Sequence, residues 1–484
     1  MIQGQTTIFD FLYPKYKIKK PIRLIELFAG YGSQYLALKY LGANVEHYKI
    51  CEWAVKSIQA YNDLHIQNYC DYSKCLCDKL VLDALMIYGV SINYNEPATR
   101  EQLKKQDFRN IYNNIIATNN LVNIQNVKGK DFKIVDKNQY DYIMTYSFPC
   151  QDLSLAGERK GMADTSTRSG MLWEVERILN ELKKLDQLPQ VLLMENVPQV
   201  HGMDNVEHFN KWQLALEKLG YKNYFQDLIA TDYGIPQTRK RCFMISILGN
   251  YSYVFPKPMP LKLKLKDILE DEVDENYYLS ERMIKYCLPS SSGGLDRKTQ
   301  FLNNLKNDDI AQKITTKAGC RATDNSIMEK ENKMLIKNAT KKGYLEARDG
   351  DGIDISARME HHRGTVQKDK IQTLTTSGGN DRGVCIGTYQ YSKSDKFMQG
   401  RERLQLGKET SDTLQTSPKE GICFNDLRIR RLTPLECFRL MGVKDDDYYK
   451  IAKNQSKTSL YHLAGDSIVV DVLMAIFKEM MEQE

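Results

Sequence analysis

The sequence predicts an α/β protein with a doubly wound, mostly parallel sheet and a second, irregular β-rich domain. A short apolar strand pattern over 22–28 leads through a glycine turn into a helical pattern that ends at Gly42, with Ser33 as its candidate cap. A second strand over 45–50 and helical spacing over 54–61 follow. The region 257–420, in contrast, is rich in Lys, Thr, Gly and Asp and shows little helical periodicity.

The later elements follow from the same patterns. A polar, Asn-rich and Lys-rich stretch at about 64–138 interrupts the alternation and is interpreted as an insertion. Further strands are expected over 140–146, 191–194, 224–229 and 242–248, with helices over 171–185, 209–219 and 467–481. The last helix is strongly apolar and is expected to pack back on the first domain.

These patterns divide the chain into four segments. They are a tail over 1–20, a cofactor-binding domain over 21–249 that carries the insertion, a second domain over 250–425, and a returning segment over 426–484.

Composition limits the function classes. Among 484 residues, 68 basic and 62 acidic side chains give a net charge of +6, which permits a local basic groove without requiring one. No signal peptide and no apolar run of roughly 20 residues are seen, so we expect a cytoplasmic protein without a membrane segment. The eleven cysteines are then expected to be mostly reduced. Cys70, Cys75 and Cys77 lack paired ligand spacing, and no metal is expected.

The first chemical signal is the turn that contains Gly30 and Gly32, followed by Glu52 after the second strand. Glycines allow close approach of a ligand to the backbone, and an acid at this place can accept hydrogen bonds from a ribose. The spacing falls short of the full dinucleotide fingerprint, which disfavours a nicotinamide dehydrogenase. A tight structural turn is the alternative.

Two further signals lie at strand ends, which face the ligand crevice in such sheets. Cys150 follows Pro149, which stiffens the turn, and is a candidate nucleophile, although most cysteines are core residues. Glu195 ends the next strand, where a poorly solvated carboxyl group could share a proton or simply cap the following turn.

A basic segment is the last signal. In an extended segment alternate side chains point the same way, so Gln237, Arg239 and Arg241 are expected on one face, unless they form a solvated charge run.

Seven motifs occur in a specific order: FAGYG, EW at 52–53, SFPCQDLS, ENV at 195–197, YGIPQTRKR, RRLTPLECFRLMG and AGDSIVV. As a set they resemble the C5-cytosine DNA methyltransferases. The resemblance implies a Rossmann-like S-adenosylmethionine-dependent methyltransferase that acts on double-stranded DNA as a monomer, with 250–425 as the target recognition domain.

The resemblance also assigns roles to residues. The expected catalytic residues are Cys150 as nucleophile, Glu195 at cytosine N3, and Arg239 and Arg241 near the base and its backbone. Glu52 is expected to hold the ribose and Trp53 to pack against adenine. The expected cofactor-binding residues are Phe28, Gly30, Gly32, Glu52, Trp53, Asn123, Pro149, Leu172, Asp466 and Ser467. Asp466 stands where the family usually has Asn, and Asn123 where it usually has Asp. Cys437 is interpreted as a core thiol.

Several alternatives stay open. A tRNA cytosine-5 methyltransferase shares nearly all of the motifs but carries a smaller middle region. A DNA-binding regulator that has lost catalysis is a second alternative. Restriction–modification, phage self-protection and solitary modification are all compatible with the motifs. The candidate base readers are Arg321, Arg358, Arg363, Arg382, Arg401 and Arg403. Gln5, Ile8 and Phe9 resemble a sliding-clamp-binding peptide, or an N-terminal element that packs on the domain.

Overall fold

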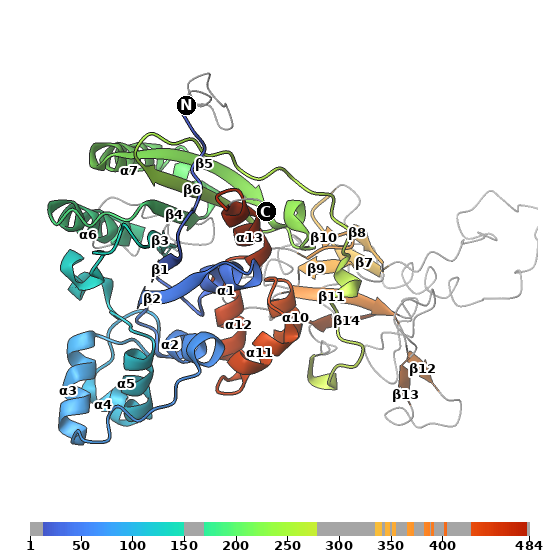
Figure 1. The fold of residues 1–484 in the computed structure, drawn as a ribbon. Helices are drawn as coiled ribbons and strands as arrows, with labels where there is room; N and C mark the ends of the chain where they lie inside the picture. Colours follow the sequence, from blue (N-terminus) through green and yellow to red (C-terminus); the bar gives the residue numbers. More distant parts are fainter. Residues whose placement is uncertain are drawn as a thin grey trace, which may run out of the picture. The chain divides into compact units, whose positions relative to one another are not determined.

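In the computed structural model the chain folds into two compact units (Figure 1). The first unit contains Met1–Ile235, Arg239–Leu261 and Phe438–Glu484, and the second contains Pro236–Thr238 and Lys262–Cys437. The structure describes residues 13–149, 169–277, 334–340, 344–348, 351–354, 365–371, 382–387, 389–391, 401–403 and 427–481.

A six-stranded sheet in the order β2-β1-β3-β4-β6-β5 forms the centre of the first unit. Its strands are β1 (Ile22–Leu27), β2 (Val45–Cys51), β3 (Asp141–Tyr146), β4 (Val191–Asn196), β5 (Tyr221–Ile229) and β6 (Lys240–Leu248). β1 to β4 pair in parallel, whereas β6 is antiparallel to both of its neighbours. This mostly parallel sheet confirms the predicted fold class.

Helices cover both faces of the sheet (Figure 1). Alternate strand residues such as Met144 and Met194 share a buried cluster with the apolar faces of α6 (Leu172–Lys184) and α7 (Val206–Leu219). The intervening residues, such as Ile143, are buried as well. This is why the central strands appear as nearly continuous apolar runs in the sequence. The remaining helices of the sheet region are α1 (Ser33–Tyr40), α2 (Val55–Tyr61), α11 (Asp445–Ala452), α12 (Lys457–Asp466) and α13 (Val470–Lys478). The helix α10 (Pro434–Arg439) spans the boundary between the two units, which falls after Cys437.

The insertion forms a small helical bundle with a core of its own. It contains α3 (Asp78–Tyr88), α4 (Arg100–Lys104) and α5 (Phe108–Ala117). Val81, Leu103 and Ile115 are among its fully buried residues. The chain then returns to the sheet, where the Leu121 N–H donates to Ile50 O across 2.9 Å beside β2. The insertion therefore ends at the sheet edge next to Glu52.

Several predicted boundaries were wrong by a few residues. Gly32, not Ser33, is the N-cap of α1, and it adopts a left-handed conformation without a side-chain cap. The helix predicted from Phe209 begins three residues earlier, at Val206, as α7. The predicted helix over 467–481 begins only at Val470, since Ser467 is the C-cap of α12.

The described part of the second unit consists mainly of short strands. A four-stranded sheet has the order β10-β9-β11-β14, and its described pairs are antiparallel. Its strands are β9 (Gly352–Asp354), β10 (Val366–Gln367), β11 (Arg382–Gly387) and β14 (Leu427–Arg431). Two hairpins pair β7 (Met334–Lys337) with β8 (Tyr344–Ala347) and β12 (Tyr389–Tyr391) with β13 (Arg401–Arg403).

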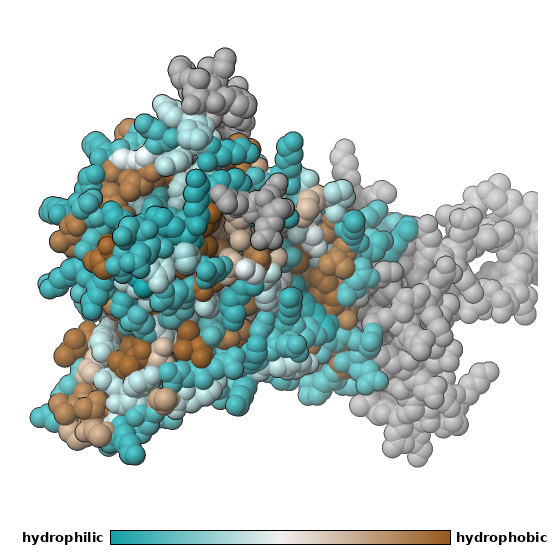
Figure 2. Space-filling model, viewed as in Figure 1, coloured by the Kyte–Doolittle hydropathy of each residue, from teal (hydrophilic) through white to brown (hydrophobic). Residues whose placement is uncertain are grey.

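The face of the molecule in Figure 2 is largely hydrophilic, with apolar side chains scattered among polar ones. Leu80, Met86 and Ile87 of α3 are among the exposed apolar residues. One stretch of the described chain, Lys457–Lys478, is long and apolar enough to cross a membrane. Because 72% of that stretch is buried inside the protein, it fits the core helices of a globular unit.

Candidate active site

Several predicted site residues of the first unit lie at one edge of the sheet. Phe28, Glu52 and Ser147 follow directly after β1, β2 and β3, and Glu195 lies near the end of β4. The carboxyl ends of parallel strands meet at the same edge, which is where ligands bind in open α/β sheets. β6 runs the other way, so Arg241 near its start lies at this edge too.

The Glu52 carboxylate joins two turns. Its Oε2 accepts a hydrogen bond from the Gly30 N–H at 2.8 Å, and its Oε1 accepts one from the Ala54 N–H at 2.7 Å. The residue is only 8% exposed. Burial raises the pKa of Glu52 to about 7, although the backbone hydrogen bonds act in the opposite direction. The Glu52 side chain is therefore fixed in place, and its charge changes with pH near 7.

The turn after β1 has an unusual backbone. Phe28, Gly30 and Gly32 all have positive φ, at 58°, 56° and 84°. A Cβ added to Gly30 would meet no heavy atom within 4 Å, so this part of the backbone faces open space that a ligand could fill. A Cβ on Gly32 would lie 2.5 Å from Tyr61 Cε2 and 2.6 Å from His65 Nε2. The two glycines thus serve different purposes.

An alanine at Gly32 is expected to destabilise the protein by about 2–5 kcal/mol, because overpacking and a left-handed alanine both carry a penalty. Tyr61 cannot move away easily, since it is fully buried and its hydroxyl donates to Glu26 Oε2. Urea unfolding of the variant measures the loss. Gly30→Ala is the matched comparison, and we expect it to lose about 1 kcal/mol. Equal losses in the two variants would contradict the steric argument.

Asn120 was missed by the sequence analysis. Its Oδ1 accepts a hydrogen bond from the Glu52 N–H at 3.0 Å, and its Nδ2 donates to Glu52 O at 2.8 Å. Asn123, the predicted residue, is buried, and its Oδ1 accepts from the Gln125 N–H instead. Trp53 is partly buried against the core of the helical insertion. Asn120 is thus the side chain that fixes the backbone of Glu52.

The end of α12 is fastened by Arg239. The Arg239 guanidinium, 5% exposed, donates to Ser467 O at 2.7 Å and to Gly465 O at 3.1 Å. These are carbonyl groups that a helix end leaves without intrahelical partners. Ser467 is buried, whereas the adjacent Asp466 is exposed. Arg239 therefore joins the start of β6 to α12, and its predicted place near the base stays a prediction.

Glu195 lies between β3 and β6. Its Oε1 is 3.1 Å from Arg241 Nε, and its Oε2 accepts a hydrogen bond of 2.5 Å from Ser147 Oγ. Glu195 is 4% exposed, so this ion pair is largely removed from water. The next residue, Asn196, donates through Nδ2 to Phe148 O at 3.0 Å. These contacts tie the end of β4 to the residues that lead into Pro149.

Other predicted residues are placed differently. Cys150 lies outside the described residues, directly after Pro149. Leu172 is fully buried in the cluster under α6. Gln237 is buried in the second unit, whereas Arg239 and Arg241 belong to the first, so the three residues of the predicted face are divided between the units.

A family model described as C-5 cytosine-specific DNA methylase matches residues 98–482. The chain belongs to this family. It is 31% identical to the type II methyltransferase M2.ScrFI of Lactococcus lactis subsp. cremoris over 470 residues, which cover 96% of this chain and 100% of the relative. It is 36% identical over 279 residues to the orphan methyltransferase M.SssI of Spiroplasma monobiae, which covers 56% of this chain and 70% of that protein.

Solved structures support the same fold. A methyltransferase of Entamoeba histolytica, EhMeth, has a TM-score of 0.50 at 13% identity and covers 96% of this chain and 98% of its own. A mutant of the Spodoptera frugiperda DNMT2 has a TM-score of 0.51 at 15% identity, with 95% and 99% covered. At such low identities the likeness concerns the fold alone. By its family, this protein is a DNA (cytosine-5)-methyltransferase.

The buried cysteines of the described chain are poor nucleophile candidates. Cys51, Cys242 and Cys437 are buried, and burial raises the pKa of Cys51 and of Cys242 well above its ordinary value. A thiolate is the reactive form, so these two thiols stay inert. Cys70, Cys75 and Cys77 are exposed and free in the insertion.

One group in the methyltransferase has the residue types of a metal site. The ligand atoms of His201, Asp227 and Cys242 lie within 4.8 Å of one another. His201 Nε2 is 2.8 Å from Asp227 Oδ1, and Lys240 Nζ is 3.2 Å from Asp227 Oδ2. The Lys240 ammonium is thus already paired with the Asp227 carboxylate. These contacts connect β5 and β6 with the turn after β4.

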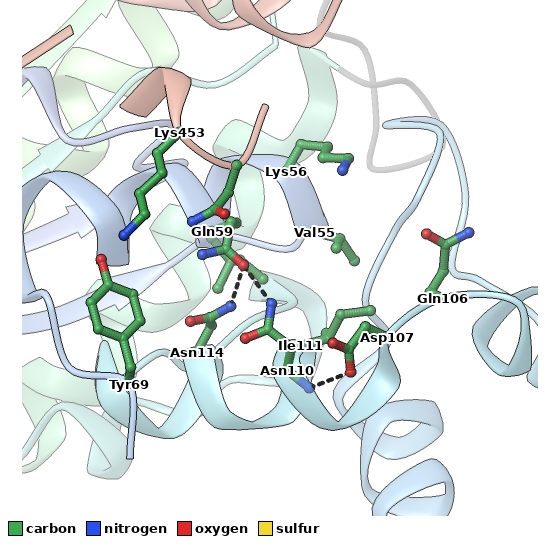
Figure 3. Close-up of a pocket in the computed structure, with 12 residues that line it drawn as sticks. Val55, Lys56, Gln59, Tyr69, Gln106, Asp107, Asn110, Ile111, Asn114 and Lys453 are labelled. Carbon is green, nitrogen blue, oxygen red and sulfur yellow. Dashed lines mark hydrogen bonds between the residues drawn. The ribbon is translucent and has the colours of Figure 1, made fainter. Parts of the chain in front are cut away.

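A polar pocket of about 530 Å³ lies between α2, α5 and the residues before α12 (Figure 3). None of the predicted site residues lines it. Gln59 Oε1 accepts hydrogen bonds of 2.7 Å from Asn110 Nδ2 and from Asn114 Nδ2, which point toward it in Figure 3. This amide cluster fastens the helical insertion of the methyltransferase to α2.

Proposed function

We propose that this methyltransferase transfers a methyl group from S-adenosylmethionine to C5 of a flipped cytosine in a specific duplex sequence, through a covalent bond between Cys150 and C6. The observation that carries the proposal is the Glu195–Arg241 ion pair at the sheet edge. It lies beside the segment that leads to Cys150, to which Ser147 and Asn196 tie it. The family supplies the reaction class.

The residues divide the chemistry among them. The Cys150 thiolate adds to C6, which makes C5 nucleophilic. Glu195 hydrogen-bonds or protonates N3, and Arg241 stabilises the negative charge that develops on the ring. A new bond joins C5 to the methyl group as the sulfur–methyl bond breaks. H5 then leaves as a proton, and the bond between Cys150 and C6 breaks to restore the ring. The base must first leave the stack, at a cost of a few kcal/mol.

The residues at the ends of β1, β2 and α12 fit the cofactor. S-adenosylmethionine supplies an electrophilic methyl group when it is bound. Gly30 borders open space, and the Glu52 carboxylate can accept hydrogen bonds from ribose hydroxyls. We add Asn120, which holds the backbone of Glu52. The other proposed cofactor residues stay as predicted: Phe28, Gly32, Trp53, Asn123, Pro149, Leu172, Asp466 and Ser467.

Cofactor binding is expected to weaken below neutral pH. The ionised form of Glu52 accepts the ribose hydroxyls, and its pKa is about 7, so the dissociation constant should be about tenfold larger at pH 6 than at pH 8. For folding, the contribution of Glu52 is fully present below its ordinary value of 4.5 and is lost as the pH rises through 7. Calorimetric titrations at both pH values measure the binding.

A matched control is available because the pKa of buried Glu26 is also raised to about 7. Glu26→Gln should keep the pH dependence of cofactor binding, since Glu26 hydrogen-bonds Tyr61 and the Tyr35 N–H rather than the cofactor turn. A pH dependence that vanished with Glu26 instead would refute the assignment to Glu52.

The wider organisation is also proposed. Residues 250–425 act as the target recognition domain between the cofactor-binding domain over 21–249 and the returning segment over 426–484. Arg382 lies on β11, and Arg401 and Arg403 lie on β13. The remaining candidate base readers, Arg321, Arg358 and Arg363, and the candidate clamp-binding residues Gln5, Ile8 and Phe9, lie outside the described residues. We propose a cytoplasmic monomer that serves restriction–modification or solitary modification, as the names of its relatives suggest.

Bisulfite sequencing of DNA from cells that express the chain tests the proposal. The expected result is C5 methylation within one short sequence context, absent from cells with an empty vector. An assay with purified protein compares duplex DNA and tRNA as acceptors. Methylation of tRNA alone would overturn the DNA assignment.

A further inference from the structure

A loop of the helical insertion, Ser91 to Pro97, is hydrogen-bonded to the segment that follows Glu52. The Ser91 N–H donates to Trp53 O at 2.8 Å, and Ser91 O accepts from the Val55 N–H at 2.9 Å. The first residue of the loop is thus fixed beside the proposed cofactor residues Glu52 and Trp53. Nothing in the seven motifs involves this loop.

The loop holds its shape through its own polar groups. Ser91 Oγ donates to Glu96 O at 2.7 Å, and Asn93 Oδ1 accepts from the Asn95 and Glu96 N–H groups at 3.0 and 3.2 Å. Tyr94 stands at the tip with φ 64°, although it is not a glycine. A non-glycine residue in this conformation persists only where its surroundings enforce it, and such residues cluster at ligand sites.

The Tyr94 ring reaches α12. It stacks on the imidazole of His462 with a centroid distance of 3.9 Å and an interplanar angle of 19°. One helical turn further, Asp466 Oδ2 lies 3.0 Å from His462 Nδ1. Burial and the nearby charges of Glu52 and Asp466 raise the pKa of Tyr94 above its usual range. Tyr94 therefore lies close to the ends of both β2 and α12.

We propose that loop 91–97 forms a wall of the cofactor pocket, with Tyr94 as a positioning residue that holds the ends of β2 and α12 together by stacking on His462. The inference rests on the proposed cofactor roles of Glu52 and Asp466. The neighbours of Tyr94 in the loop, Asn93, Asn95 and Glu96, are exposed, whereas the Tyr94 hydroxyl is buried. The helical insertion thereby takes part in cofactor binding.

The test measures S-adenosylmethionine binding to the full chain by calorimetry without DNA, followed by steady-state kinetics. Tyr94→Ala is expected to raise the cofactor Kd and KM by about three- to tenfold, the size of one aromatic stack. The kcat at saturating cofactor and the KM for DNA should stay within about twofold. Tyr94→Phe should bind normally. His462→Ala should match Tyr94→Ala, and the double variant should add little.

Tyr72→Ala is the matched control, since Tyr72 is an exposed tyrosine of the same insertion whose hydroxyl accepts a hydrogen bond from Asn68 Nδ2. An unchanged Kd in Tyr94→Ala, or an equal rise in Tyr72→Ala, would overturn the inference. Should Tyr94→Ala fail to fold, the result for His462→Ala decides. The variant Glu52→Gln separates failure of the loop proposal from failure of the proposed cofactor site. Lost binding in Glu52→Gln with normal binding in Tyr94→Ala refutes only the loop, whereas normal binding in Glu52→Gln refutes the proposed cofactor site itself.

Discussion

Serine at Cys150 is expected to lower methyl transfer by about 10³-fold or more while cofactor binding survives. The attacking species is a thiolate. A free cysteine thiol has a pKa of about 8.5, whereas a serine hydroxyl is far harder to ionise. The proposed cofactor contacts come from Glu52 and the Gly30 turn, which belong to other strand ends. Transfer of a labelled methyl group to duplex DNA measures the first effect, and calorimetry measures the second.

Cys437→Ala is the control for this experiment. Cys437 is the motif cysteine other than Cys150 that a sequence comparison could mistake for the nucleophile, yet it is fully buried at the end of the second unit. We expect the alanine variant to stay active with some loss of stability. Full activity in Cys150→Ser would exclude the proposed mechanism. Loss of activity in Cys437→Ala at normal stability would point to Cys437 as the nucleophile instead.

Much of the central sheet could be predicted from the sequence because its signals are local. The strand before Phe28 is a short apolar run that ends at glycines with positive φ, and both features are visible in the letters alone. Since parallel strands share one carboxyl edge, residues at the ends of such strands are expected to lie at that edge. The position of Glu52 and Glu195 at the ends of predicted strands therefore indicated that they lie there together.

The missed features depend on contacts between distant segments. No helices were predicted in the insertion because its polar residues hide a narrow apolar stripe, whose burial shows only when three short helices pack together. Asn120 supports Glu52 from 68 positions away, and Arg239 reaches α12 from 226 positions away. The local sequence of a basic run does not distinguish an arginine that binds a helix end from one that binds a DNA base.

Glutamine at Glu195 is expected to reduce kcat by about 10²- to 10⁴-fold with little change in cofactor binding. The amide can still hydrogen-bond, but it cannot transfer a proton to N3. The variant also removes the negative partner of Arg241, whose Nε is 3.1 Å from the carboxylate in a largely buried setting. Single-turnover kinetics with saturating DNA isolates the chemical step, and Arg241→Ala should lower the same rate.

The structure offers a control that separates catalysis from the loss of an ion pair between a carboxylate and an arginine. Glu181 also pairs with an arginine, Arg177 at 2.8 Å, and accepts a hydrogen bond from the Gly129 N–H, but it lies on α6. Glu181→Gln should lose stability and keep its single-turnover rate within about twofold, since α6 supplies none of the reacting groups. If Glu181→Gln and Glu195→Gln slowed the chemical step equally, the effect at Glu195 would reflect a loosened sheet rather than proton transfer. A large loss at Glu195 alone, with normal stability, is the pattern that the position of its carboxyl group between Ser147 and Arg241 predicts.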